Sequence, residues 1–151
     1  MLVFKIEIDE LEEEIDSYTR GHITLQGRHK TISSKISKSN KNQSMMIFIS
    51  LIDLLYGICA VLSIPERKTT YDFVGVGCSF EFFIVKKDAS NLILTTAKNE
   101  LIDEIPPGVF IEIIWQEVNT FMLNYGELLE SGSVKYDLTN ATKDFKKQFN
   151  L

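Results

Sequence analysis

The sequence feature that most constrains the fold is an almost wholly apolar stretch over residues 45–62. Its length approaches the roughly 20 residues that an α-helix needs to cross a bilayer. Asp53 lies near its middle, where an ionised carboxylate would be costly in lipid. Ser50, Asp53, Gly57 and Ala60 recur at helical spacing as a narrow small and polar stripe, and apolar residues occupy the other sides. The pattern predicts a central helix buried in a globular core and argues against a membrane span.

Two short segments that precede this helix have the pattern of strands. Apolar and polar residues alternate over residues 2–8, and residues 21–27 form a second short run bounded by glycines. A period of two is typical of a strand with one buried face. In the second strand we expect His22 to share a face with Thr24 and Gln26 and to point towards solvent.

The segments that follow the central helix predict both strands and helices. Residues 71–96 alternate around a turn signal at residues 88–91, which is typical of an antiparallel meander. Apolar residues then recur every three or four positions over residues 109–130, which predicts a long amphipathic helix. Residues 134–138 are expected to form a short edge strand, and residues 139–150 a last helix.

The segment between the first two strands is strongly acidic. Asp9 is a suitable helix cap, and Glu12 stands in the reciprocal capping position three residues later. Leu11, Ile15 and Tyr18 would then lie along one face of a short helix. The segment predicts a short acidic helix or a turn.

The order of these elements predicts an α+β fold in which an antiparallel sheet packs against one buried central helix and one long amphipathic helix. The chain has 151 residues, a normal size for one domain, and only 3 prolines and 8 glycines. This composition leaves no room for a long flexible linker. We therefore expect residues 1–151 to form a single α+β domain.

The sequence contains no recognisable catalytic or metal-binding motif. His22 and His29 are the two histidines, and neither stands near a cysteine or another histidine at the spacing of metal ligands. Cys59 and Cys78 lie within apolar runs, which favours buried free thiols. Residues 75–79 contain two glycines but stand between predicted strands, which favours a tight turn over a phosphate-binding loop. We therefore expect a protein that is not an enzyme and that uses neither a cofactor nor a metal ion.

The distribution of charge is more informative than its total of −5. Residues 1–20 carry seven acidic side chains against Lys5 and Arg20. An acidic chain is a poor match for nucleic acid, because phosphate binding requires a basic surface. The acidic segment predicts either a solvated face or a binding surface for a basic protein, formed by Glu10, Glu12, Glu13, Glu14 and Asp16.

The combined pattern resembles small bacterial immunity proteins of the polymorphic-toxin type. The resemblance rests on the strands FKIEI (4–8) and GHITL (21–25), the helix LIDLLYG (51–57), the aromatic hairpin FEFFI (80–84) and the helix FMLNY (121–125). It implies a protein without catalytic residues that neutralises a cognate toxin by forming a tight complex. The first residues show no signal-peptide pattern, so we expect a cytoplasmic protein.

Two alternatives remain open at this point. One is a small-ligand-binding or oligomeric scaffold protein, with a pocket near the central helix formed by Ser50, Asp53 and Tyr56. An exposed edge at residues 134–138 would also support a homodimer. The other is an enzyme with an unfamiliar site, which would require several ionisable groups to converge in one cleft.

Overall fold

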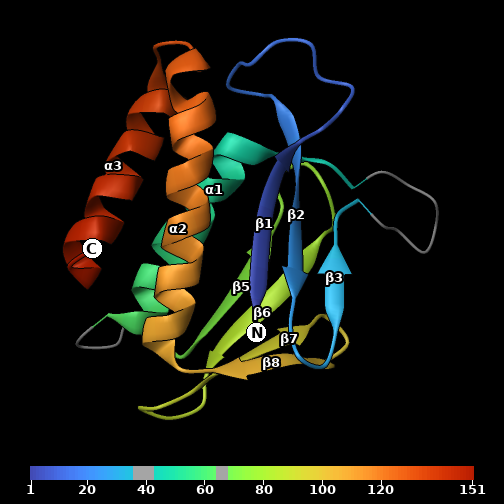
Figure 1. Ribbon diagram of the computed structural model, residues 1–151, viewed down its shortest axis with the longest axis vertical. Helices are drawn as coiled ribbons and strands as arrows, with labels where there is room; N and C mark the ends of the chain where they lie inside the picture. Colours follow the sequence, from blue (N-terminus) through green and yellow to red (C-terminus); the bar gives the residue numbers. More distant parts are fainter. Residues whose placement is uncertain (36–42, 64–67) are drawn as a thin grey trace.

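The computed structural model describes residues 1–35, 43–63 and 68–151. Across these residues the chain forms α-helices and two antiparallel sheets, so the expected α+β class is confirmed. The helices lie together on one side of the sheets (Figure 1). The prediction of one sheet missed that the strands before and after the central helix belong to separate sheets.

The first sheet is built around β2 (Arg20–Gln26). The strand β1 (Val3–Ile8) pairs over its whole length with β2. The register Phe4↔Leu25 and Ile6↔Ile23 places apolar residues on one buried face. The short strands β3 (Thr31–Ser33) and β4 (Met45–Met46) pair with successive parts of β2.

The second sheet is the predicted meander. Its strands β5 (Thr70–Val74), β6 (Glu81–Lys86), β7 (Leu92–Thr96) and β8 (Leu101–Ile105) pair in chain order. The last of them, β8, was not predicted from the sequence. The turn between β2 and β3 contacts β8, where the amide of His29 donates to the carbonyl of Ile102 over 3.0 Å.

The central helix α1 (Ile47–Leu62) is buried as predicted, with seven of its large apolar side chains wholly excluded from solvent: Ile47, Phe48, Leu51, Leu54, Leu55, Ile58 and Val61. The long amphipathic helix is α2 (Pro107–Tyr125), continued by one 3₁₀ turn, η1 (Gly126–Leu128). It packs on β1, whereas α3 (Ser133–Phe149) packs on α1. Within the described ranges, no helix is long and apolar enough to cross a bilayer.

One local prediction needs correction. Residues 134–138 belong to α3 and form no edge strand, because Leu138, Ala141 and Phe145 continue one buried face at helical spacing. The homodimer edge expected there does not exist. Of the two alternatives for the acidic segment, the structure has turns and no helix, since Leu11 and Tyr18 are exposed while Ile15 packs against the core.

Two further sequence features concern residues outside the described ranges. The polar composition of residues 37–44 predicts a loop, and only residues 43 and 44 of it are described. Pro65 predicts the end of the central helix, and residues 64–67 lie outside the described ranges.

Candidate functional site

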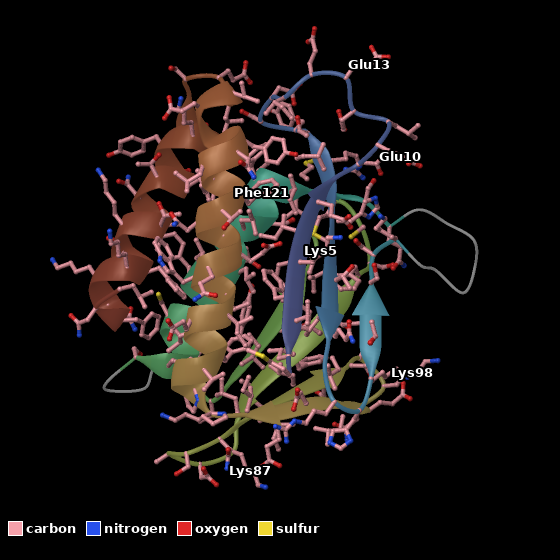
Figure 2. All side chains as sticks on the ribbon, in the orientation of Figure 1. Lys5, Glu10, Glu13, Lys87, Lys98 and Phe121 are labelled. Atoms are coloured by element: carbon pink, nitrogen blue, oxygen red, sulfur yellow. The ribbon has the colours of Figure 1, made fainter. Side chains whose placement is uncertain are left out.

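The acidic loop, residues 9–19, joins β1 to β2 at one end of the molecule (Figure 1). It carries all five residues of the predicted protein-binding surface. Glu10, Glu13, Glu14 and Asp16 are exposed, and Glu12 is partly exposed. Figure 2 shows the side chains of Glu10 and Glu13 on the outside of this loop.

The acidic loop combines buried polar residues with exposed apolar ones. Three of its polar residues, Asp9, Ser17 and Thr19, are buried, with exposed fractions of 5%, 9% and 1%. Two of its large apolar residues point outward, since Leu11 is 80% exposed and Tyr18 is 67% exposed, whereas Ile15 packs against the core. The loop therefore uses polar contacts to hold its own shape and presents apolar side chains to solvent.

Two of the predicted binding residues hold the loop together. The Glu12 carboxylate accepts a hydrogen bond of 2.8 Å from the amide of Arg20. The Asp16 carboxylate accepts one of 2.8 Å from the amide of Tyr18, and the amide of Asp16 donates to the Thr19 hydroxyl over 2.7 Å. Such side-chain bonds to nearby amides are typical of ordered turns.

The carboxylates of the other three predicted binding residues remain available for contact with a partner. Those of Glu10, Glu13 and Glu14 form no hydrogen bond or ion pair with any residue in the described ranges. The predicted surface thus divides into two residues that shape the loop and three that face solvent. Sequence alone could not separate them, because the division depends on which way each side chain points.

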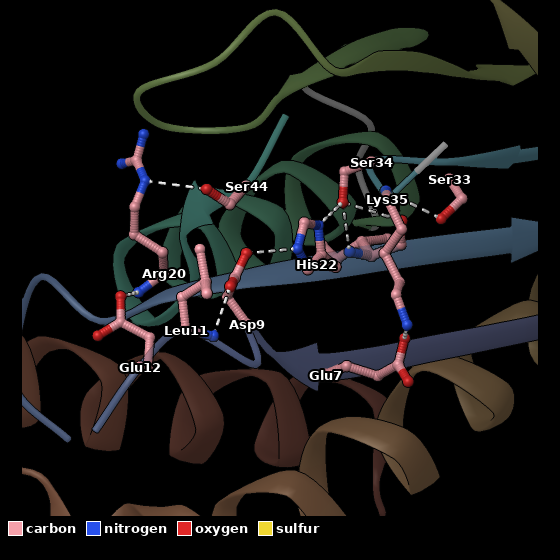
Figure 3. A network of polar contacts seen from close by, with 11 residues as sticks. Glu7, Asp9, Leu11, Glu12, Arg20, His22, Ser33, Ser34, Lys35 and Ser44 are labelled. Carbon is pink, nitrogen blue, oxygen red and sulfur yellow. Dashed lines mark hydrogen bonds and ion pairs between the residues drawn. The ribbon is translucent and has the colours of Figure 1, made fainter. Parts of the chain in front are cut away.

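A buried polar network fixes the start of the acidic loop (Figure 3). His22 Nε2 lies 2.8 Å from the Asp9 carboxylate, and Nδ1 lies 2.9 Å from the Ser34 hydroxyl. The second oxygen of Asp9 accepts a hydrogen bond of 2.9 Å from the amide of Leu11. The expectation that His22 faces solvent is wrong: it is 5% exposed, because the acidic loop and the end of β3 cover it.

The Asp9–His22–Ser34 network contains the residue types of a hydrolase triad but not its geometry. In such a triad the serine bonds to Nε2 and reaches the substrate. Here Asp9 holds Nε2, and the Ser34 hydroxyl is wholly buried and accepts a hydrogen bond of 3.1 Å from the amide of Ile23. A hydroxyl in this position cannot meet a substrate, so the network acts as an anchor between strands and loop.

The acidic loop also contacts the connection between α2 and α3. The Ser17 hydroxyl donates to the carboxylate of Glu130 over 3.2 Å. Leu128, in the adjacent 3₁₀ turn, is 60% exposed. This contact extends the acidic end of the molecule from the loop onto the helical layer.

The three residues of the predicted pocket do not converge. Ser50 is wholly buried and accepts a hydrogen bond of 3.0 Å from the amide of Val76. Asp53 is exposed and accepts one of 2.7 Å from the Tyr71 hydroxyl. Tyr56 points to α3 instead.

The described residues form two notable hollows elsewhere. One, of about 380 Å³, lies between β3 and the β7–β8 turn, with Ile32, Phe80 and Ala97 among its lining residues. The other, the inter-helix pocket, lies between α1 and α3 and has a volume of about 400 Å³. It is lined by Tyr56, Cys59, Ala60, Ser63, Asp144 and Gln148.

Both cysteines are free thiols, and Cys59 is half-buried in the inter-helix pocket. Burial, with a smaller effect of the Asp144 charge, raises the pKa of Cys59 from 9.0 to about 11. At pH 8 only about 0.1% of this thiol is ionised, and the thiolate is the reactive form. We expect iodoacetamide to modify Cys59 about 100-fold more slowly than an unperturbed thiol, with a rate that rises up to about pH 11. Peptide mass spectrometry over time would measure this rate, with the urea-unfolded chain as control; equal rates would contradict the prediction.

No group of histidine, cysteine, aspartate or glutamate side chains in the described part of the chain is arranged to hold a metal ion. The chain matches no model of a known protein family, and comparison with curated proteins and with solved structures also gave no match. Any functional interpretation therefore rests on the geometry of the molecule and on the resemblance noted in its sequence pattern.

Proposed function

We propose that this protein is a non-catalytic inhibitor of the immunity-protein type, which neutralises a basic toxin domain by binding it through the acidic loop. The observation that carries this proposal is the exposure of Leu11 and Tyr18 on a loop that buries its polar residues Asp9, Ser17 and Thr19 and is otherwise rich in exposed carboxylates. A loop built only for connection would gain stability by the opposite arrangement, because exposed apolar surface is unfavourable in water.

The internal hydrogen bonds of the loop favour tight binding. Association costs free energy whenever a loop must be ordered on contact. Here Glu12, Asp16 and the Asp9–His22 contact already order the backbone, so less of that cost falls on complex formation. Leu11 and Tyr18 are then presented as fixed apolar anchors, and tyrosine is among the residues that dominate binding energy at protein interfaces.

The charges around these anchors favour a basic partner. Glu10, Glu13 and Glu14 flank Leu11 and precede Tyr18 in the sequence, and they form no ion pair with any residue in the described ranges. Opposite charge on a partner would accelerate encounter beyond the unsteered association rate of about 10⁵–10⁶ M⁻¹ s⁻¹. An acidic surface that engages a basic toxin also requires no turnover, which agrees with the absence of a recognised catalytic motif in the sequence.

The test is affinity capture from cells that carry the gene, at low and at high salt, followed by mass spectrometry. We expect one basic protein in stoichiometric amount, released by salt. Expressed alone in a heterologous bacterium, this partner should arrest growth, and co-expression with the present chain should restore it. A partner that does not affect growth, or capture only of the chain itself, would contradict the inhibitor proposal.

Loop variants test the assigned surface with the purified partner. Alanine at Leu11 or Tyr18 should weaken binding by about 30-fold or more, the effect of losing an anchor residue. Combined Glu10→Lys, Glu13→Lys and Glu14→Lys should slow association and flatten its dependence on salt. The single charge reversal Glu13→Lys has a matched control in Glu112→Lys, which makes the same change on the exposed side of α2. Unchanged affinity in the loop variants, measured by surface plasmon resonance, would refute the surface assignment.

A further inference from the structure

The inter-helix pocket has a distinct chemistry. Tyr56, Cys59, Ala60 and Ser63 come from α1 and the residue that follows it, whereas Asp144 and Gln148 come from one face of α3. A pocket of about 400 Å³ lies at the small end of the range for small-molecule sites, which is roughly 300–1,000 Å³. The pocket is therefore suited to a ligand of a few heavy atoms.

The charge of the pocket has one sign. Among its described lining residues, Asp144 is the single acidic residue and none is basic. The Asp144 carboxylate accepts a hydrogen bond of 3.3 Å from the Tyr56 hydroxyl and forms no ion pair with any described residue. Asp137 stands seven residues earlier, on the same face of α3 two turns away. The pocket thus has a carboxylate that no cation of the described residues pairs with.

The neighbouring ionisable groups respond to this negative charge. Burial and then the Asp144 carboxylate raise the pKa of Cys59 to about 11. Burial, Asp144 and Asp137 raise the pKa of Tyr56 as well. Both groups are therefore neutral at physiological pH, and Asp144 supplies the charge of the pocket.

We propose that the inter-helix pocket binds a small organic cation, a primary alkylammonium ion whose charged end contacts the Asp144 carboxylate. The Tyr56 hydroxyl donates to that carboxylate over 3.3 Å, so it holds the carboxylate at the wall of the pocket. The side chains of Ala60 and Cys59 offer an apolar wall to the alkyl part. This site is separate from the acidic loop, and its occupancy does not depend on the proposed inhibitor function.

Titration with butylammonium chloride, followed by ¹H–¹⁵N correlation spectra, tests the proposal. We expect saturable shifts that cluster on the amides of Tyr56, Cys59, Ser63, Asp144 and Gln148, with a dissociation constant of about 1 mM. Butan-1-ol, which has the same alkyl chain without the charge, should produce no saturable shifts at these amides. Equal binding of the alcohol, or shifts spread over the acidic loop, would overturn the proposal.

Three variants complete the test. Asp144→Asn should weaken butylammonium binding by about tenfold or more, because it removes the charge-assisted contact. Glu112→Gln removes the same charge from the exposed face of α2 and should leave binding unchanged. Ala60→Leu should weaken binding, because its larger side chain occupies the part of the pocket that receives the alkyl chain, while dispersed spectra confirm that the variant is folded. Unaltered binding to the Asp144→Asn protein would exclude an ammonium site.

Discussion

Replacing His22 by alanine is expected to lower the free energy of unfolding by about 2–3 kcal/mol, because it leaves two buried polar groups without a hydrogen-bond partner. The imidazole bridges Asp9 and Ser34, and all three residues are at most 5% exposed. Without the ring, the Asp9 carboxylate loses its 2.8 Å contact with Nε2. The Ser34 hydroxyl loses its hydrogen bond with Nδ1. Urea denaturation followed by circular dichroism would measure the change.

Two variants control for this effect. His29→Ala removes the exposed histidine and should change stability by less than about 0.5 kcal/mol. Asp9→Asn keeps a side chain that can hydrogen-bond to either form of the ring, so it should cost less than His22→Ala. If His22→Ala were as mild as His29→Ala, the network would not anchor the loop as we infer.

The same network connects stability to the proposed function. Asp9 is the first residue of the acidic loop, and its carboxylate joins the ring of His22 to the amide of Leu11. Loss of His22 should therefore loosen the segment that presents Leu11 and Tyr18 before it unfolds the core. Hydrogen exchange would show this order if the loss of His22 accelerates exchange in residues 9–19 more than in α1, each compared with the unsubstituted protein.

The fold was largely predictable because its main elements have regular apolar periods. The apolar stretch with Asp53 near its middle indicated α1, and in the structure this carboxylate reaches solvent and accepts a hydrogen bond from Tyr71. The alternation of β1 and the meander likewise corresponds to buried faces. Where local residue type and helical spacing conflicted, as at Val134 and Tyr136, helical packing against the core decided the structure.

The candidate site was predictable only in part. The excess of carboxylates marked the acidic loop, because net charge is a property of the sequence. The roles of individual residues were not accessible, since the hydrogen bonds of Glu12 and Asp16 to backbone amides depend on the loop conformation that the flanking strands set. His22 illustrates the same limit: the strand pattern placed it on a polar face, but the pattern did not show that Asp9 and Ser34 would cover that face.

Replacing Gly57 by alanine is expected to destabilise the protein by about 2 kcal/mol, although alanine is the better helix former by about 1 kcal/mol. A Cβ atom at Gly57 would overlap the Tyr71 ring, which crosses α1 at this point and donates its hydroxyl to Asp53 over 2.7 Å. The ring would have to move, and the contact between α1 and β5 would loosen.

Gly108 provides the matched comparison, because nothing lies within 4 Å of a Cβ added there. Gly108→Ala, in the first turn of α2, should therefore stabilise the protein by about 0.5 kcal/mol. The double variant Gly57→Ala with Tyr71→Leu should lose less stability than the sum of the two single changes, since the smaller side chain removes the overlap. Thermal denaturation of the four variants would measure these differences. Additive effects would show that Gly57 does not serve to admit the Tyr71 ring.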